Sequence, residues 1–194
     1  MASHWNYSHL NFTQLNLNSM KNLVFITLVC ICLISLSCQQ KIDYDAESKA
    51  IKEVIMQETR AWAAQDYPAL AACFVKDSTT TRMETGSMGH SVWFGWDENL
   101  GPYYKKATQT DWTDYKILGY RWSNWHIKVY PESAWAIYNQ HTRYTYMDEE
   151  GESKSCEIRF LENVNGKWKI VMLHWIDLVH FDEAKKAMEE AAGQ

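Results

Sequence analysis

The stretch "TRAWAAQDYPALAACFVKDSTT", residues 59–80, decides the fold of this chain. It begins inside a segment with a helical apolar period and reaches Asp66, which can cap a new helix whose first turn suits Pro68. A threonine-rich run, typical of a strand, follows. The stretch therefore predicts three consecutive elements: a helix over residues 46–65, a short helix over 69–74 and a strand over 75–82.

The first helix carries one acidic residue on its apolar face. Glu58 falls on the stripe formed by the apolar positions Ile51, Val54, Ile55 and Trp62. Burial on that stripe would raise the pKa of Glu58, which suits a general acid. Two other interpretations stay open: an arginine such as Arg143 or Arg159 pairs with the carboxylate, or Glu58 lies at the edge of the stripe and faces solvent.

The second half of the chain changes to a period of two. Apolar and aromatic positions alternate there between turn signals, which predicts antiparallel strands. Before these strands, the sequence predicts a loop over 86–89 and a helix over 91–100 that is interrupted at Gly101-Pro102. After the strands, it predicts a short C-terminal helix over 181–192. Helices followed by a meander predict an α+β fold with the helices on one face of a curved antiparallel sheet. The predicted strands span residues 112–120, 125–130, 134–146, 153–162 and 167–177.

Three stretches resemble one known family. The opening stretch, "SAWAIYNQHTRY" at 133–144 and "NGKWKIVMLHWID" at 165–177 are similar to the nuclear transport factor 2-like superfamily in its SnoaL-like branch. The resemblance covers residues 46–179 and implies a cone-shaped sheet, a cystatin-like roll, with a cavity between the first helix and the sheet. Members include isomerases, dehydratases, cyclases and subunit-association modules, so the fold alone leaves the function open.

The catalytic residues of the steroid-isomerase branch do not carry over. The position of its base falls at Arg82, which stays protonated at neutral pH. Its oxyanion tyrosine falls at Glu58, and its oxyanion aspartate falls near Ile158, beside Glu157. Only Glu58 occupies a suggestive place.

Aromatic and histidine residues supply the other candidate contacts. The chain has ten Trp and eleven Tyr, more than a core of this size requires. In residues 90–104, Trp93 and Trp96 would share a helical face, either in the core or as an aromatic rim of the cavity. The residues that we expect to bind a ligand are Trp62, His90, Trp93, Trp96, His141, Arg143 and His174.

Two of these histidines lie on predicted strands. His174 would share a strand face with Trp168, Ile170 and Met172, as a catalytic partner of Glu58 or as a core histidine. His141 shares a face with Arg143, which is either a wall of the cavity or the outer face of the sheet. The sequence does not decide the parity of that strand.

The stretch "MKNLVFITLVCICLISLSCQQ", residues 20–40, predicts where the protein is located. A basic residue, a short apolar run and small residues before Cys38 follow the order of a secretory signal, and the run is shorter than the about 20 residues of a membrane span. The stretch resembles a bacterial lipoprotein signal, which implies lipidation of Cys38 and a membrane-anchored location in the cell envelope, on the periplasmic or outer-membrane side. The predicted segments are a doubtful extension over 1–19, the signal over 20–37, a lipid-anchored tether over 38–45, a SnoaL-like domain over 46–182 and a tail over 183–194.

Several chemistries lack a sequence signature. The net charge of −5 and the scarcity of Lys/Arg clusters argue against a nucleic-acid partner. The sequence contains no local metal-binding motif, nucleophile elbow or phosphate loop, so we expect no metal and no cofactor. Apart from the predicted anchor Cys38, only Cys73 and Cys156 remain after removal of the signal, and we expect two buried thiols rather than a disulfide.

Three functions fit these observations. The first is a lipid-anchored domain that binds a small, partly apolar molecule in an aromatic-lined cavity, with Glu58, His141 and His174 as polar contacts. The second is a cofactor-free lyase or isomerase in which Glu58 and His174 are catalytic. The third is an interaction module, since the resemblance implies a homodimer formed through the outer face of the sheet.

Overall fold

The computed structural model describes residues 42–87, 89–179 and 188–190, which belong to one compact unit beginning at Ile42. The predicted signal, the predicted lipidation site Cys38 and most of the predicted C-terminal helix lie outside the described residues. No helix within these ranges is both long enough and apolar enough to cross a membrane.

The two predicted N-terminal helices are confirmed, each beginning two residues earlier than expected. Helix α2 spans Tyr44–Ala63 and is capped by Asp43, whose carboxylate accepts a bond from the backbone N–H of Ala46 at 3.1 Å. Helix α3 spans Tyr67–Ala72, where Asp66 accepts from the N–H of Ala69 at 3.0 Å. Pro68 lies in the first turn of α3, as predicted. A proline suits this position because it has no N–H that would be left unpaired at the helix start.

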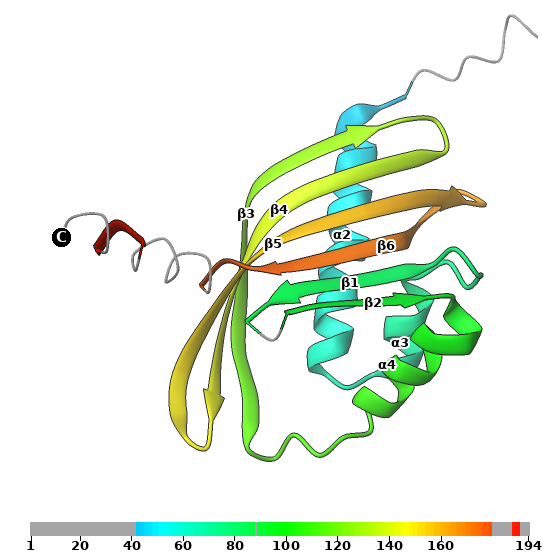
Figure 1. Ribbon diagram of the computed structural model, residues 1–194. Coiled ribbons are helices and arrows are strands. Elements are labelled where there is room, and N and C mark those ends of the chain that lie inside the picture. The colour runs from blue at the N-terminus through cyan, green and yellow to red at the C-terminus, as the bar shows by residue number, and fades with distance from the viewer. Residues whose placement is uncertain (1–41, 88, 180–187, 191–194) are drawn as a thin grey trace, which may run out of the picture. The chain divides into compact units, whose positions relative to one another are not determined.

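The α+β class with a mostly antiparallel sheet is confirmed. The sheet has the order β2-β1-β6-β5-β4-β3, and every neighbouring pair is antiparallel except β1 and β6. Figure 1 shows the long strands β3–β5 bending strongly while α2 runs across one face of the sheet. The strands are β1 (Thr81–Gly86), β2 (Gly89–Phe94), β3 (Tyr115–Val129), β4 (Ser133–Tyr146), β5 (Glu149–Val164) and β6 (Lys167–Asp177).

The helix predicted over 91–100 is confirmed only from Trp96 onward, and its first part is wrong. Residues up to Phe94 form β2, which pairs with β1 in a hairpin. A π-helical turn, Trp96–Leu100, then leads into α4, Gly101–Ala107. The expected break at Gly101-Pro102 is absent because this proline lies in the first turn of α4, where it is compatible with a helix.

Two strand predictions also need correction. The threonine-rich run begins with a turn, in which Asp77 accepts bonds from the N–H groups of Thr79 and Thr80, so β1 starts only at Thr81. The strands predicted over 112–120 and 125–130 are one strand, β3. An irregularity between Ser123 and His126 explains the apparent gap in the pattern.

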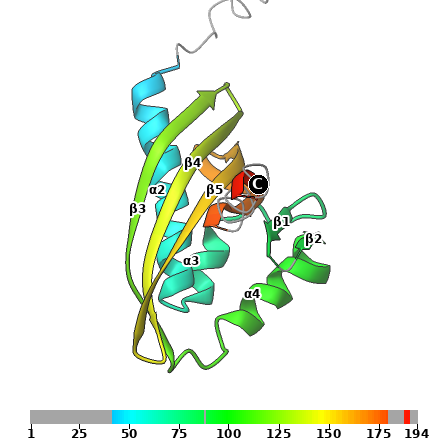
Figure 2. The same cartoon turned by 60° about the vertical axis from the view of Figure 1, so that its left-hand side comes forward.

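The two faces of the sheet differ in burial. Along β4, Ala134, Ala136 and Tyr138 are buried, and these positions define the inner face, which packs against α2. By register, Glu157 and Arg159 of β5 point the same way. Figure 2 shows α3 and α4 on the same side of the sheet as well.

Strand β6 contains a bulge that reverses its alternation. Leu161 pairs with Ile170 but Phe160 pairs with Met172, so β6 has one extra residue at this point. Ile170 and Leu173 are both buried on the inner face, and His174 lies on the outer face. The predicted common face for His174, Trp168 and Ile170 is therefore wrong.

Candidate functional site

A cavity lies between α2 and the inner face of the sheet. Its volume is about 310 Å³, at the lower end of the about 300–1,000 Å³ typical of ligand sites. Its aromatic wall comes from α2, β3 and β6, and its polar lining comes mainly from α2, β1, β4 and β5. The aromatic residues are Trp62, Tyr115, Tyr120 and Trp175, and the main polar residues are Glu58, Thr59, Arg82, Glu84, Gln140, Glu157 and Arg159.

Three buried ionisable side chains lie together in the wall of the cavity. Nη1 of Arg159 donates to Oε2 of Glu157 at 2.7 Å, and Nη2 lies 3.4 Å from Oε2 of Glu58. Ser155 donates to the other oxygen of Glu157 at 2.8 Å. Arg159 thus links α2 to β5 by pairing with a carboxylate on each. Of the interpretations of Glu58 given above, the structure shows the pairing with Arg159.

Glu58 is the carboxylate whose acidity this arrangement changes most clearly. Burial raises the pKa of Glu58 above its ordinary value of 4.5, while Arg159 and Arg82 oppose the rise and Glu157 adds to it. The prediction of a buried Glu58 is confirmed, since only 4% of the residue is exposed. A carboxyl group of this kind can hold or release a proton toward the cavity.

Arg82 forms a second polar cluster on β1. Its Nε donates to Glu84 at 2.8 Å and its Nη1 donates to the hydroxyl of Tyr104 at 2.9 Å. The guanidinium also lies 5.8 Å from the ring centroid of Trp62 and 5.7 Å from that of Tyr103. These contacts fix the position of the charge beside the aromatic wall.

Gln140 of β4 is oriented by two hydrogen bonds. Its Oε1 accepts from Nε1 of Trp122 at 2.9 Å and from the hydroxyl of Thr59 at 3.4 Å. Both donors go to the amide oxygen, so the amide nitrogen is the remaining donor of this side chain. Gln140 can therefore bind an acceptor group of a ligand in the cavity.

Among the aromatic candidates, only Trp62 lines this cavity. Trp96 is buried in the core, with its ring 5.5 Å from that of Phe74, and so fills the core rather than forming a rim. Trp93 packs on Tyr103 with ring centroids 5.0 Å apart. Trp93 and Trp96 do not share a helical face because Trp93 belongs to β2.

The histidine candidates lie on the outer face. The hydroxyl of Thr85 is 2.9 Å from Nδ1 of His90 and 3.0 Å from Nε2 of His174. Burial lowers the pKa of His174, and His90 lowers it further, while Glu157 opposes the change. The structure thus joins His90 to His174 and separates both from Glu58.

The parity of β4 also places His141 and Arg143 on the outer face. Nε2 of His141 is 3.1 Å from a carboxylate oxygen of Glu152, and Arg143 contacts Glu150 at 3.3 Å. Their neighbours on the strand, Gln140 and Thr142, line the cavity instead.

Sequence reasoning missed most of the polar lining. Arg82, Glu84 and Gln140 were not predicted as site residues, and Arg159 was considered only as a partner of Glu58. Gln140 follows Ala134, Ala136 and Tyr138 at two-residue spacing, and the burial of these three positions in the structure assigns it to the inner face. Within the described ranges, no group of three or more His, Cys, Asp or Glu side chains is placed to hold a metal ion.

Comparison with known proteins supports the fold. No protein-family model and no curated protein matches the sequence. Among solved structures, the association domain of CaMKII from C. elegans has a TM-score of 0.54 at 16% identity, over 68% of this chain and 95% of its own. An NTF2-like protein from Cytophaga hutchinsonii has a TM-score of 0.51 at 13% identity, over 71% and 99%. An NTF2-like protein of unknown function from Shewanella oneidensis has a TM-score of 0.50 at 16% identity, over 68% and 99%.

These similarities define the class of fold. The chain has the nuclear transport factor 2-like fold, as the resemblance of its three motifs implied. At identities below a fifth, the shared feature is the architecture and not an activity.

Proposed function

We propose that this protein binds a small, partly apolar molecule in the cavity between α2 and the sheet. The observation that carries the proposal is the buried pair of Glu58 and Arg159 in the wall of an aromatic-lined space. Removing charges from water is costly, and such groups cluster at functional sites more often than elsewhere. In this cavity they supply polar contacts for one end of a ligand.

The cavity divides the contacts between two parts of the ligand. Trp62, Tyr120 and Trp175 offer ring surfaces to an apolar portion. Gln140 and the charged groups offer hydrogen bonds to a polar portion. Of the residues singled out in the sequence, we keep Glu58 and Trp62 in this site.

A cofactor-free lyase or isomerase is the second candidate, favoured by the raised pKa of Glu58. A buried carboxyl group facing a cavity can act as a general acid or base. Its partner in proton transfer would be Glu84 or Glu157, which line the same cavity, rather than His174 on the outer face.

A ligand screen with two matched variants tests both candidates. Thermal shifts would be measured against metabolites, steroids, polyketides and sugars, and a compound at 100 times its Kd should raise the unfolding free energy by about 2.7 kcal/mol. Glu58→Gln should weaken binding of a hit, whereas Glu53→Gln, on the exposed side of the same helix, should not. If Glu58→Gln abolishes turnover and leaves binding intact, the protein is an enzyme. Equal binding by both variants, without an effect on turnover, would remove Glu58 from the site.

The cellular location is also a proposal. We propose a membrane-anchored lipoprotein of the SnoaL-like type in the cell envelope, on the basis of residues 20–40. The substitution Cys38→Ser should release the processed protein from the membrane fraction. Retention of this variant in the membrane would contradict lipidation of Cys38.

The homodimer stays a prediction. Two large apolar side chains on the outer face of the sheet are exposed, Phe94 at 63% and Phe160 at 45%. A measurement of the molar mass in solution shows whether the protein is a dimer. A monomeric mass at micromolar concentration would contradict the interaction module.

A further inference from the structure

The cavity continues into a groove at the far end of the sheet. This groove, which we call the hairpin groove, lies where β4 turns into β5, and Tyr115 and Ser153 line both it and the cavity. It is further lined by Tyr144, Tyr146, Glu149, Glu150 and Gly151. Since a cavity of about 310 Å³ holds only a small compound, a longer ligand would extend past Tyr115 into this groove.

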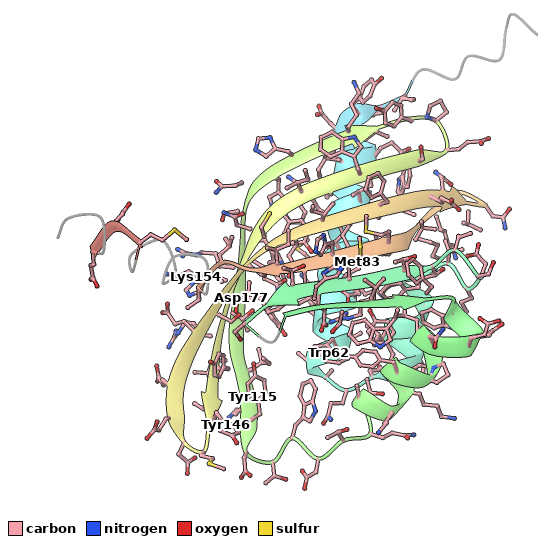
Figure 3. The ribbon with its side chains drawn as sticks, in the orientation of Figure 1. Trp62, Met83, Tyr115, Tyr146, Lys154 and Asp177 are labelled. Atoms are coloured by element: carbon pink, nitrogen blue, oxygen red, sulfur yellow. The ribbon has the colours of Figure 1, made fainter. Side chains whose placement is uncertain are left out.

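A row of aromatic rings follows the same path. The centroid of Trp112 lies 5.4 Å from that of Trp62 and 5.9 Å from that of Tyr115. Tyr115 then stacks on Tyr144 at 5.0 Å, with 29° between the ring planes. Figure 3 shows Tyr115 and Tyr146 at the hairpin end and Trp62 toward the helices. Aromatic surfaces are thus present from the cavity to the tip of the sheet.

The ring of Tyr144 is held against the backbone of the next strand. A Cβ atom on Gly151 would lie 2.7 Å from the ring of Tyr144, so only glycine gives the ring this place. Stacking on Tyr115 holds its other side. Rings that are fixed before binding lose little conformational entropy when a ligand packs on them.

The polar lining selects the chemistry of the ligand. Thr59, Gln140, Thr142 and Ser153 carry groups that both donate and accept hydrogen bonds, and the aliphatic lining of the cavity is limited to Ile117 and Leu173. A hydrocarbon or steroid skeleton would displace water from these groups and leave many of them without partners, which is costly. Hydroxyl groups match them, since each also donates and accepts.

We infer that the cavity and the hairpin groove together bind an oligosaccharide. A sugar ring presents polarised C–H groups to an aromatic face and hydroxyls around its edge, which is the pattern of this lining. One terminal unit occupies the cavity, and the following units pass Tyr115, which stacks on Tyr144, and lie along Tyr146. Glu149, opposite Tyr146, accepts hydrogen bonds from hydroxyl groups at the hairpin end of the groove. The inference rests on the proposed function and extends the same site.

Binding of sugars of different length tests this inference. The probes are glucose, galactose and N-acetylglucosamine and the linear β-1,4-linked tetrasaccharide of each, titrated against the full chain by tryptophan fluorescence and calorimetry. We expect at least one tetrasaccharide to bind ten times more tightly than its monosaccharide. Tyr146→Ala should weaken binding of that tetrasaccharide by about five- to tenfold, the worth of one aromatic contact, and leave monosaccharide binding unchanged.

An exposed tyrosine at the opposite end of the sheet provides the control. Tyr130 is 46% exposed and Tyr146 is 53% exposed, so Tyr130→Ala should leave all sugar affinities unchanged. A tetrasaccharide that binds no better than its monosaccharide, or equal effects of the two variants, would overturn the role of the groove. If no sugar binds but another compound of the ligand screen does, the inferred ligand class is wrong and the cavity proposal stands. If nothing binds, both fail.

Discussion

Oε2 of Glu58 lies 3.4 Å from Nη2 of Arg159, although 101 residues separate them in the sequence. The pair joins α2 to β5, and both side chains are at most 6% exposed. Arg159 also pairs with Glu157, while its Nε is buried and has no hydrogen-bond partner among the described residues. One guanidinium thus pairs with two carboxylates. Because it lies 2.7 Å from Glu157 and 3.4 Å from Glu58, it stabilises a negative charge on Glu58 less than one on Glu157.

Removal of the shared arginine should destabilise the protein strongly. Arg159→Met leaves two buried carboxylates without their counter-charge, which should cost about 3–5 kcal/mol of unfolding free energy. Arg143→Met removes an exposed pair and should cost about 0–1 kcal/mol. Urea unfolding of both variants at neutral pH measures the difference. Similar losses in the two would show that the buried pairs do not act as described.

The raised pKa of Glu58 should make stability fall as pH rises. Above pH 4.5, its ordinary pKa, the folded state keeps a proton on Glu58 that the unfolded state releases. The contribution of Glu58 is therefore full below pH 4.5 and lost as the pH passes the raised value. Urea unfolding between pH 4 and 8 should show this decline in the wild type and in Glu53→Gln, but a smaller decline in Glu58→Gln. Parallel curves for all three proteins would contradict the shift.

The two cysteines of the described ranges should differ in reactivity. Both are free thiols, Cys73 buried and Cys156 partly exposed. Burial raises the pKa of Cys73 to about 12, and the charge of Glu58 adds to the rise while Lys169 opposes it. Iodoacetamide should therefore modify Cys156 in the folded protein and Cys73 only after unfolding, as peptide mass spectrometry can measure. Equal labelling rates in the folded state would contradict the burial of Cys73.

Glycine at position 151 should be sensitive to a single added methyl group. Gly151→Ala forces the ring of Tyr144 away from its place and should cost about 1 kcal/mol of unfolding free energy. Gly119→Ala on β3 meets no atom within 4 Å and should be neutral or slightly stabilising. Urea unfolding and near-ultraviolet circular dichroism of the tyrosines compare the two. An unchanged tyrosine signal in Gly151→Ala would show that the ring is not held there.

The sequence was informative where local chemistry decides the structure. Asp66 and Pro68 predicted the start of α3 because capping and a fixed φ act within a few residues. Glu58 was recognised as buried because helical spacing alone puts it on the apolar stripe.

The parts that the sequence missed depend on distant contacts. Alternation along β4 is compatible with either parity, and only packing against α2 assigns Gln140 to the cavity and His141 to the outer face. Residues 91–94 were predicted as a helix because their strand signal is weak. They form a strand because they pair with β1, which is a contact outside the local sequence.

The bulge of β6 has a consequence for how this strand tolerates mutation. Before the inserted residue, even-numbered positions such as Trp168 and Ile170 are buried; after it, odd-numbered Leu173 is buried. A scan of charged substitutions along β6 should therefore show a two-residue rhythm that changes phase at residues 171–172. Deletion of Val171 would restore one rhythm to the whole strand, with the side chain of Leu173 still toward the helices and the imidazole of His174 still on the outer face.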